Sequence, residues 1–398
     1  MRKLLLATTM VAALASPAIS PAVADEIKVG IILGFTGPIE SLTPDMGSAA
    51  ELAFKEVSDS GMLLGGKTIV SVRADSTCVD SAAATTAAER LITSDGVVAI
   101  MGADCSGVTG AIANNVAVPN GVVMVSPSAT SPGLSDMDDK GLFFRTAPSD
   151  ARQGQVIADI LKSRDIMDVA VTYTNNDYGK GLSDSFLNAY AKVGGSVSMT
   201  AAHEDGKADY SAEVAALSAA GSKHLAVFGY VDQGGKGIIQ ASLDTGAFDN
   251  FILADGMIGD SLIAAIGDDL NGAVAPPPGA ETPGANTFSS MAEKAGITVG
   301  GPFTGESYDA GALIALAMQA AGSSDRAAIQ SKLMDVANAP GETIMPGDLK
   351  NALTILANGG QVNYEGATGV EFNSLGEVLG SYKELELING KYETINVR

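Results

Sequence analysis

The chain has 398 residues, enough for two domains of ordinary size, and 46% of them are hydrophobic, so both domains can bury a core. Its formal net charge of −22 at pH 7 argues against nucleic acid or any other polyanion as a partner. A charge of this size also favours a soluble monomer.

The N-terminus has the pattern of a secretory signal peptide over residues 1–24. Arg2-Lys3 is a basic start, Leu4–Leu14 is an apolar stretch, and Ala22-Val23-Ala24 is a small-x-small cleavage site. We expect cleavage after Ala24 and export to the periplasm. There is no cysteine at the cleavage point, so the sequence does not indicate a lipid anchor. No later run reaches the ~18 apolar residues that a membrane span needs.

The first part of the mature chain alternates strands with helices. We predict strands over 27–33, 69–74, 97–102 and 122–125, and helices over 46–57, 80–92 and 108–116. This alternation indicates an α/β fold, with a parallel sheet covered by helices on both faces. Ligands bind such sheets at the carboxyl ends of the strands. The loops at that edge cover 34–39, 75–78, 104–109 and 126–132.

One of these loops joins the strand over 97–102 directly to the next helix. Such a turn points free backbone N–H groups and the positive end of the helix at one spot, which suits a carboxylate or a phosphate. Ser106 adds a hydroxyl donor there. For this stretch taken alone, an ordinary strand–turn–helix corner with a serine cap is the alternative.

Two cysteines, Cys78 and Cys105, lie on neighbouring loops at this edge. Export to an oxidising compartment makes a disulfide plausible, and two buried free thiols are the alternative. A bond between them would stabilise the fold by about 3–4 kcal/mol, because it closes a loop of roughly 28 residues.

The pattern restarts near Ala147-Pro148. We predict strands over 169–173, 196–200, 224–228 and 251–254, and helices over 150–162, 211–220 and 235–243, with a further helix that ends at Val193. A proline-rich crossing over 276–283 leads to helices over 307–321, 325–336 and 346–358. The tail over 362–397 has the pattern of strands and turns, with Asn389-Gly390 as a hairpin signal.

The strand ends carry a set of polar and aromatic side chains: Ser106, Ser128 and Thr130 in the first unit, and Tyr178, Tyr230 and Asp255 in the second. The first three are donors suited to a carboxylate, and the acid of the second unit suits an ammonium group. Two units facing each other across a cleft would therefore match a zwitterionic amino acid. The alternatives are an ordinary Asp-Gly turn and half-buried tyrosine rings.

Other motifs do not support catalysis, a metal or a cofactor. Gly61–Thr68 has the spacing of a nucleotide P-loop, but it follows a helix and enters a strand, the reverse of what that loop requires. His203 and His224 are the only histidines, and neither has neighbouring metal-ligand spacing. The sequence offers no base–nucleophile pair, so we expect no enzyme.

Several motifs appear in an order that resembles one family: Ile31–Pro38, Asp75–Cys78, Gly102–Ser106, Ser126–Thr130, Asp177-Tyr178-Gly179, Gly229-Tyr230, Asp255-Gly256, Glu306–Ala310 and Tyr364–Gly369. The chain resembles the leucine/isoleucine/valine-binding group of periplasmic solute-binding proteins of ABC transporters over nearly its whole mature length. The resemblance implies a type I fold of two lobes that close on a ligand. It implies an N-terminal lobe of 25–147 plus 276–358 and a C-terminal lobe of 148–275 plus 359–398.

The resemblance also implies roles for single residues. Ser106 and Thr130 would bind the α-carboxylate. The Ser128 carbonyl, the Thr130 hydroxyl and Asp255 would bind the α-ammonium group. Tyr230 would hydrogen-bond the ligand, and Tyr178 would line the side-chain pocket. A Cys78–Cys105 disulfide and an inner-membrane permease with its ATPase as partner are implied as well.

Three positions depart from the family pattern and leave the ligand's side chain open. Asp255 stands where the branched-chain binders have Glu, Leu42 lies roughly where an aromatic wall is usual, and Asp104 stands where an apolar residue is usual. We predict an L-amino acid as ligand, aliphatic or branched-chain, with a polar or larger one as an alternative. Further alternatives are an amide, urea or aromatic acid as ligand, a sensor that feeds a receptor kinase, and an exported α/β enzyme.

Overall fold

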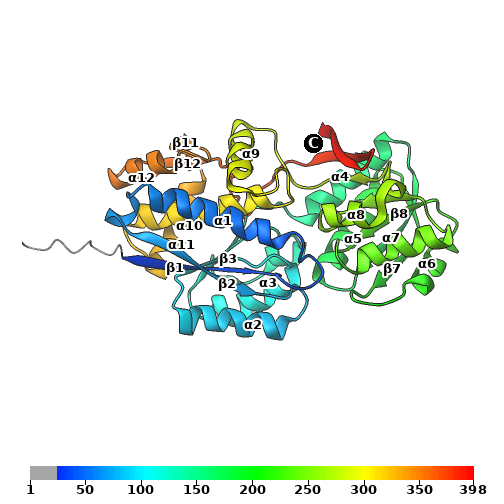
Figure 1. The fold of residues 1–398 in the computed structure, drawn as a ribbon, viewed down its shortest axis with the longest axis horizontal. Coiled ribbons are helices and arrows are strands. Elements are labelled where there is room, and N and C mark those ends of the chain that lie inside the picture. The colour runs from blue at the N-terminus through cyan, green and yellow to red at the C-terminus, as the bar shows by residue number, and fades with distance from the viewer. Residues whose placement is uncertain (1–24) are drawn as a thin grey trace, which may run out of the picture.

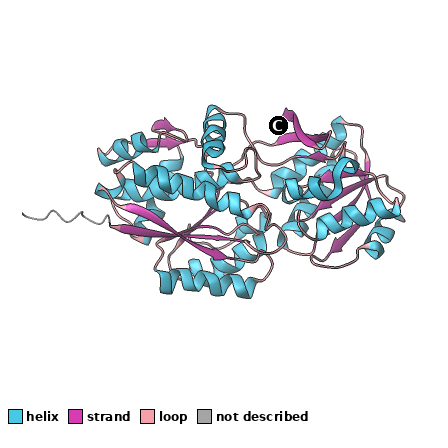
Figure 2. Ribbon diagram, viewed as in Figure 1, coloured by secondary structure: helices cyan, strands magenta, loops and turns pink. Residues whose placement is uncertain are grey.

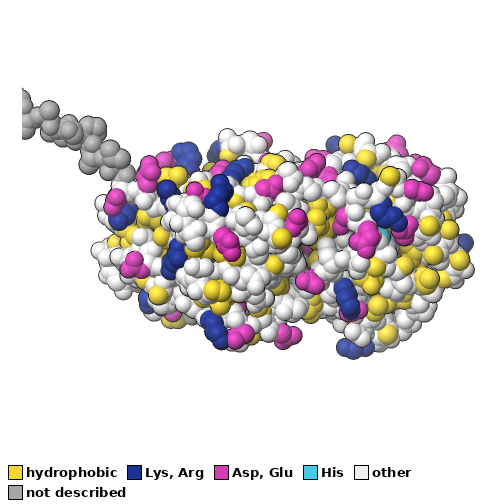
Figure 3. Space-filling view, turned by 90° about the horizontal axis from the view of Figure 1, so that it is seen from below, with side chains coloured by type: hydrophobic (Ala, Val, Ile, Leu, Met, Phe, Trp, Pro, Cys, Tyr) yellow, Lys and Arg dark blue, Asp and Glu magenta, His cyan; other side chains and the backbone are white. Residues whose placement is uncertain are grey.

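The computed structural model describes residues 25–398 and shows two lobes side by side (Figure 1). The predicted signal peptide and its cleavage site fall in residues 1–24, outside the described residues. Figure 3 shows the outline narrowing between the lobes, with acidic side chains scattered over both rather than gathered in one patch. Within the described part of the chain, no helix has the length and apolar character needed to cross a bilayer.

The first lobe is built on a five-stranded parallel sheet with helices on both faces (Figure 2). Its strands, in spatial order, are β2 (Thr68–Asp75), β1 (Glu26–Leu33), β3 (Ala99–Gly102), β4 (Val123–Ser126) and β5 (Phe143–Arg145). Its helices are α1 (Thr43–Asp59), α2 (Ser81–Arg90), α3 (Ser106–Ile112), α9 (Pro283–Ala295), α10 (Thr304–Ala321), α11 (Arg326–Ala337) and α12 (Leu349–Ala357). The central strands β3 and β4 are buried at every residue, as continuous apolar runs require in a sheet covered on both sides.

The second lobe contains a seven-stranded sheet. Its strands, in spatial order, are β14 (Lys391–Val397), β13 (Lys383–Ile388), β10 (Val274–Ala275), β9 (Asn250–Leu253), β8 (His224–Phe228), β6 (Asp168–Thr174) and β7 (Ser196–His203). Its helices are α4 (Asp150–Ser163), α5 (Asp177–Lys192), α6 (Ser211–Ser218), α7 (Gly234–Thr245) and α8 (Asp260–Ile266). The five strands from β10 to β7 are parallel, and β13 and β14 add an antiparallel hairpin at the edge.

The α/β fold class is confirmed, and so is the hairpin predicted at Asn389-Gly390, which joins β13 to β14. The analysis of the sequence missed the short strand β5 and the helices α8 and α9. Helix α9 begins at Pro283, where the sequence predicted only a proline-rich crossing. Proline is favoured in the first turn of a helix, so this residue starts an element here rather than ending one.

A short third sheet lies close to the last predicted lobe boundary, Asn358. Strand β12 (Val362–Tyr364) pairs in parallel with β11 (Glu342–Ile344), and the Tyr364 hydroxyl donates to Asp309 Oδ1 at 2.8 Å. Asp309 lies in α10, so the chain stays packed on that helix as far as Tyr364. The predicted lobe boundaries near Ala147, Ala275 and Asn358 stay a proposal.

Helix α10 is buried over almost its whole length and carries two buried acids at its start. The Asp309 carboxylate accepts hydrogen bonds from Tyr364, Ala367 N and Thr368, which fixes the 364–368 loop on this helix. Burial raises the pKa of Glu306 to about 8. In the unfolded chain the same carboxyl group ionises near pH 4.5, so folding strengthens its hold on the proton.

We therefore expect Glu306 to make the fold less stable at alkaline pH. The contribution of protonated Glu306 to the stability of the fold is fully present below the pKa of the unfolded chain. It is lost as pH rises toward the pKa of Glu306 in the folded protein. At about pH 5 the Glu306→Gln variant should match the parent protein in free energy of unfolding. At about pH 8 it should be more stable by a few kcal/mol at most. Denaturant titrations at both pH values measure this, and equal stabilities at the higher pH would contradict it.

Candidate functional site

A small cavity of about 30 Å³ lies between the lobes, at the carboxyl ends of the strands of both sheets. Five of the six predicted site residues line it: Ser106, Ser128, Tyr178, Tyr230 and Asp255. The sixth, Thr130, does not. The structure therefore brings the predicted residues together across a gap between the lobes, and their role in ligand binding stays a prediction.

The first lobe contributes two serines. Ser106 is the first residue of α3, directly after β3 and the Cys105 cap, and its Oγ accepts a hydrogen bond from Ser131 N at 3.1 Å. Its own O–H stays available to donate. Ser128 follows β4, and its Oγ donates to the Asp104 carbonyl at 3.2 Å. The first-lobe side of the cavity thus offers the Ser106 hydroxyl as a donor, next to the backbone at the start of α3.

The second lobe contributes an acid and two aromatic rings. Asp255 follows β9 and is 2% exposed, and its Oδ1 accepts hydrogen bonds from the Tyr178 hydroxyl at 2.6 Å and from Gly256 N at 2.9 Å. The Tyr178 and Tyr230 rings stack with their centroids 5.2 Å apart. Asn176, the cap of α5, donates through Nδ2 to the Tyr230 hydroxyl at 3.3 Å.

A second buried acid, Asp150, is the first residue of α4, and no motif in the sequence singled it out. Both of its carboxylate oxygens, like Thr130 Oγ1, are inaccessible to solvent and lack a hydrogen-bond partner among the described residues. The backbone links the two residues, since Asp150 N donates to the Thr130 carbonyl at 2.9 Å. Thr130 is therefore buried beside Asp150 instead of lining the cavity.

The two buried acids, Asp150 and Asp255, disfavour each other's ionised form. Burial and the nearby charge of Asp255 raise the pKa of Asp150 well above its ordinary value. Burial also raises the pKa of Asp255, although the hydrogen bonds from Tyr178 and Gly256 oppose this. Two like charges in a low-dielectric interior need a proton or a cation near them.

Among residues 25–398, no basic side chain lines the cavity. Arg145 is the positive charge that acts on Asp150, but its guanidinium group is already engaged. Nη2 lies 2.6 Å from Glu377 Oε1, and Nη1 donates to the Ala129 and Ser131 carbonyls. The positive charge that would balance the acids has to come from a ligand or from protons.

Four apolar side chains also line the cavity, and so does a further acid, Asp104. The apolar residues are Ile39, Leu42, Met46 and Phe303. Leu42 lies there as the resemblance suggested, and the sequence analysis missed the other three. Phe303 has a positive φ of 58°, which is uncommon for a residue with a side chain, and it precedes α10 directly. No sequence pattern singles it out, because the loop before α10 reaches the cavity only through the packing of the lobe.

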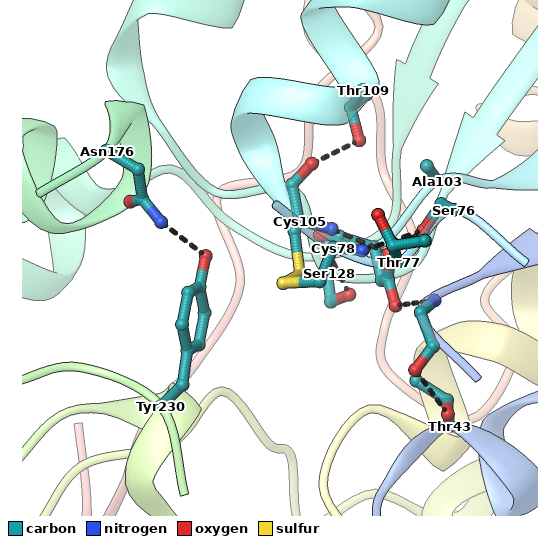
Figure 4. Close-up of a disulfide and its surroundings, with 12 residues drawn as sticks. Thr43, Ser76, Thr77, Cys78, Ala103, Cys105, Thr109, Ser128, Asn176 and Tyr230 are labelled. Atoms are coloured by element: carbon teal, nitrogen blue, oxygen red, sulfur yellow. Dashed lines mark hydrogen bonds between the residues drawn. A yellow bond between two sulfur atoms is a disulfide. The ribbon is translucent and has the colours of Figure 1, made fainter. Parts of the chain in front are cut away.

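The disulfide between Cys78 and Cys105 is confirmed, with Cα atoms 5.1 Å apart. It ties the loop after β2 to the start of α3, beside Ser106. Figure 4 shows the Tyr230 hydroxyl pointing to Asn176, with this disulfide and Ser128 to one side of the ring. The bond therefore holds two of the loops that form the first-lobe wall.

The lobes contact each other on both sides of the cavity. On one side, Asp232 N donates to the Pro38 carbonyl at 3.0 Å and Ser41 N donates to Asp232 Oδ2 at 2.9 Å. On the other side, α5 packs on the 131–132 loop at Gly181. A Cβ atom on Gly181 would lie 2.9 Å from Pro132 Cδ. The observed arrangement of the lobes therefore leaves no room for a side chain at this position.

Within residues 25–398, no three His, Cys, Asp or Glu side chains are grouped to hold a metal ion. His203 is buried in the second lobe, where its Nδ1 pairs with Thr172 Oγ1 at 2.8 Å and desolvation lowers its pKa to about 4. It lies outside the cavity lining. The chemistry available in the cavity is thus hydrogen bonding, negative charge and apolar contact.

Comparison with known proteins gives a consistent result. A family model described as periplasmic binding protein matches residues 26–361. The chain is 33% identical to Leu/Ile/Val-binding protein homolog 3 of Brucella melitensis, over 53% of this chain and 56% of that protein. It is 29% identical to Leu/Ile/Val-binding protein homolog 1 of Brucella abortus, over 81% of this chain and 85% of that protein.

Solved structures share the fold at lower identity. A leucine binding protein LivK from Thermotoga maritima superposes with a TM-score of 0.77 at 24% identity, covering 93% of this chain and 98% of that one. An ABC transporter solute binding protein from R. palustris, in complex with 4-hydroxybenzoate, superposes with a TM-score of 0.76 at 19% identity, covering 94% and 97%. At these identities the likeness concerns the fold and leaves the ligand open.

Proposed function

Because the chain belongs to the periplasmic binding protein family, we propose that it binds an α-amino acid between its lobes and delivers it to an ABC permease of the inner membrane. It is a binding protein and not an enzyme, as its membership and its relatives indicate. Its place in the periplasm, after removal of residues 1–24, is part of the same proposal.

The buried pair of Asp150 and Asp255 supports the amino-acid ligand most strongly. One acid lines the cavity, the other is inaccessible with both oxygens unpartnered, and no basic side chain lines the same space. An ammonium group placed against Asp255 would supply the missing positive charge. A charge-assisted hydrogen bond in a dry site is about twice as strong as a neutral one.

The ligand's carboxylate would then face the first lobe. The Ser106 hydroxyl can donate to it, and the backbone at the start of α3 lies next to that hydroxyl. The stacked rings of Tyr178 and Tyr230 would cover the head group. The ligand's side chain would extend toward the apolar residues that line the cavity. An aromatic acid such as the 4-hydroxybenzoate held by the R. palustris protein carries no ammonium group, so it would leave the buried acids unbalanced.

Binding and closure are coupled in this proposal. An amino acid would first settle on the first lobe, and Asp255 would reach it only when the second lobe swings in. The contacts of Asp232 with Pro38 and Ser41 would then hold the closed arrangement. Excluding water strengthens each charged contact, because the local dielectric falls.

Gly181 gives a steric test of closure. Leucine is a better helix former than glycine, so Gly181→Leu should leave the unliganded protein at least as stable as its parent. The added side chain would collide with the 131–132 loop when the lobes close, so affinity should fall about tenfold or more, the effect of overpacking by 1–3 kcal/mol. Calorimetric titration measures this, with Asn188→Leu on the exposed face of the same helix as control. Equal affinities would contradict closure by this route.

The ligand itself is tested by titrating the purified protein, freed of bound solute by refolding, with each of the twenty amino acids and with benzoate, 4-hydroxybenzoate, acetamide and urea. We expect at least one amino acid to bind with a dissociation constant near the micromolar range, which corresponds to about 8 kcal/mol. Binding of the aromatic acids or amides alone would overturn the proposal.

A further inference from the structure

Asp104 is a second buried acid among the residues that line the ligand cavity. It lies between β3 and α3, is 1% exposed, and lines the cavity together with residues such as Leu42 and Phe303. Burial raises its pKa, although hydrogen bonds from the backbone oppose this. A carboxyl group in this place is costly unless hydrogen-bond donors surround it.

The chain itself supplies three hydrogen-bond donors to the Asp104 carboxylate. Asp104 Oδ1 accepts hydrogen bonds from Cys105 N at 2.9 Å and from Ser76 Oγ at 3.1 Å. Oδ2 accepts one hydrogen bond, from Gly34 N at 2.6 Å. A carboxylate oxygen can accept two hydrogen bonds, so Oδ2 keeps one free lone pair, and the residue borders the cavity.

Its position also sets it apart from Asp255. Asp255 belongs to the second lobe, whereas Asp104 belongs to the first and lies near the disulfide. The two acids act on Tyr230 from their own lobes: burial raises the pKa of Tyr230 well above its ordinary value, and the charges of Asp205, Asp104 and Asp255 add to this. The cavity therefore has an acid on each side, and one ammonium group can satisfy only one of them.

We propose that Asp104 makes the site selective for amino acids whose side chain donates a hydrogen bond, through its hydroxyl or amide group. This inference rests on the proposed function and names the ligand class within it. The head group would bind Asp255, and the side chain would reach Asp104, which lines the same cavity as Leu42 and Phe303. An aliphatic side chain covers the carboxylate and gives it no donor. A hydroxyl or amide group of the same size supplies one.

Matched ligands isolate this effect. Threonine and valine have the same shape and differ by one hydroxyl, and asparagine and leucine form a similar pair. A hydrogen bond to a charged group is strong enough that the parent protein should bind threonine over valine, and asparagine over leucine, roughly tenfold to hundredfold more tightly. In Asp104→Leu both preferences should vanish or reverse. In Asp104→Asn, which keeps an acceptor oxygen, the preference should persist but shrink.

The ratio of the two affinities is the decisive readout. Asp104 also joins three loops, so a purely structural role would lower the unfolding temperature of the variants and weaken all ligands by the same factor. An unchanged ratio between threonine and valine in Asp104→Leu, or equal binding of both by the parent protein, would overturn the inference. Should no amino acid bind the parent protein, the proposed function fails, whatever Asp104 does. Asp104→Asn keeps the test open if the leucine variant does not fold.

Discussion

Replacing Asp255 with alanine is expected to weaken amino-acid binding about thirtyfold or more without loss of stability. Removing one partner of a buried charge pair costs about 2–5 kcal/mol in binding, because the other charge stays buried and unpaired. Without ligand, the same change removes one of two neighbouring buried acids, and the other, Asp150, has no hydrogen-bond partner among the described residues. The unliganded variant should therefore unfold at the parent temperature or above it.

Two further variants sharpen this experiment. Asp255→Asn keeps an oxygen that accepts from the Tyr178 hydroxyl but loses the charge, so its affinity should lie between those of the parent and the alanine variant. Asp269→Ala removes an exposed acid of the same lobe and should bind like the parent. Calorimetric titration at a fixed salt concentration compares all four proteins. Parent-like affinity in Asp255→Ala would remove this residue from the site.

The largest expected effect on stability belongs to the Cys78–Cys105 disulfide. The two cysteines are 27 residues apart, and cross-linking a loop of this length stabilises a fold by about 3–4 kcal/mol in the chain-entropy model. The double variant Cys78→Ala/Cys105→Ala should lose about that much free energy of unfolding. Its affinity should also fall, because the loop after β2 and the start of α3 are no longer tied together beside Ser106.

Denaturant unfolding under reducing and oxidising conditions separates the contribution of the cross-link from that of the cysteine side chains' packing. The parent protein with reductant should approach the stability of the double variant, and the variant itself should not respond to reductant. A loss of free energy of unfolding below about 1 kcal/mol in both would contradict a stabilising role for the cross-link.

The fold and the positions of most site residues followed from local patterns. Alternating apolar strands and amphipathic helices predict a parallel sheet, and a parallel sheet collects the loops after its strands at one edge. Ser106, Ser128, Tyr230 and Asp255 each follow a strand, so their meeting at the cavity could be expected. The disulfide could not be predicted from local patterns alone. The loops allowed either a disulfide or two free thiols, and only the family resemblance implied that Cys78 and Cys105 are bonded.

Other features depend on how distant segments pack, which no local pattern reports. Asp150 has the sequence signature of an acid in the first turn of a helix, and only the docking of α4 under Thr130 buries it. Phe303 reaches the cavity through an unusual backbone conformation. Thr130 follows a strand like its neighbours, yet its side chain turns away from the cavity toward Asp150. Strand β11 is three residues long, too short for a periodic pattern to predict it.

Helix α10 shows one consequence of how the lobes are interleaved. It is buried in the first lobe against α1, although more than two hundred residues, including most of the second lobe, are made between the two. During synthesis on the ribosome, the core of the first lobe therefore cannot be completed until α10 has emerged. A nascent chain delayed in this way stays unfolded for longer, which is the state that a secretion channel can thread.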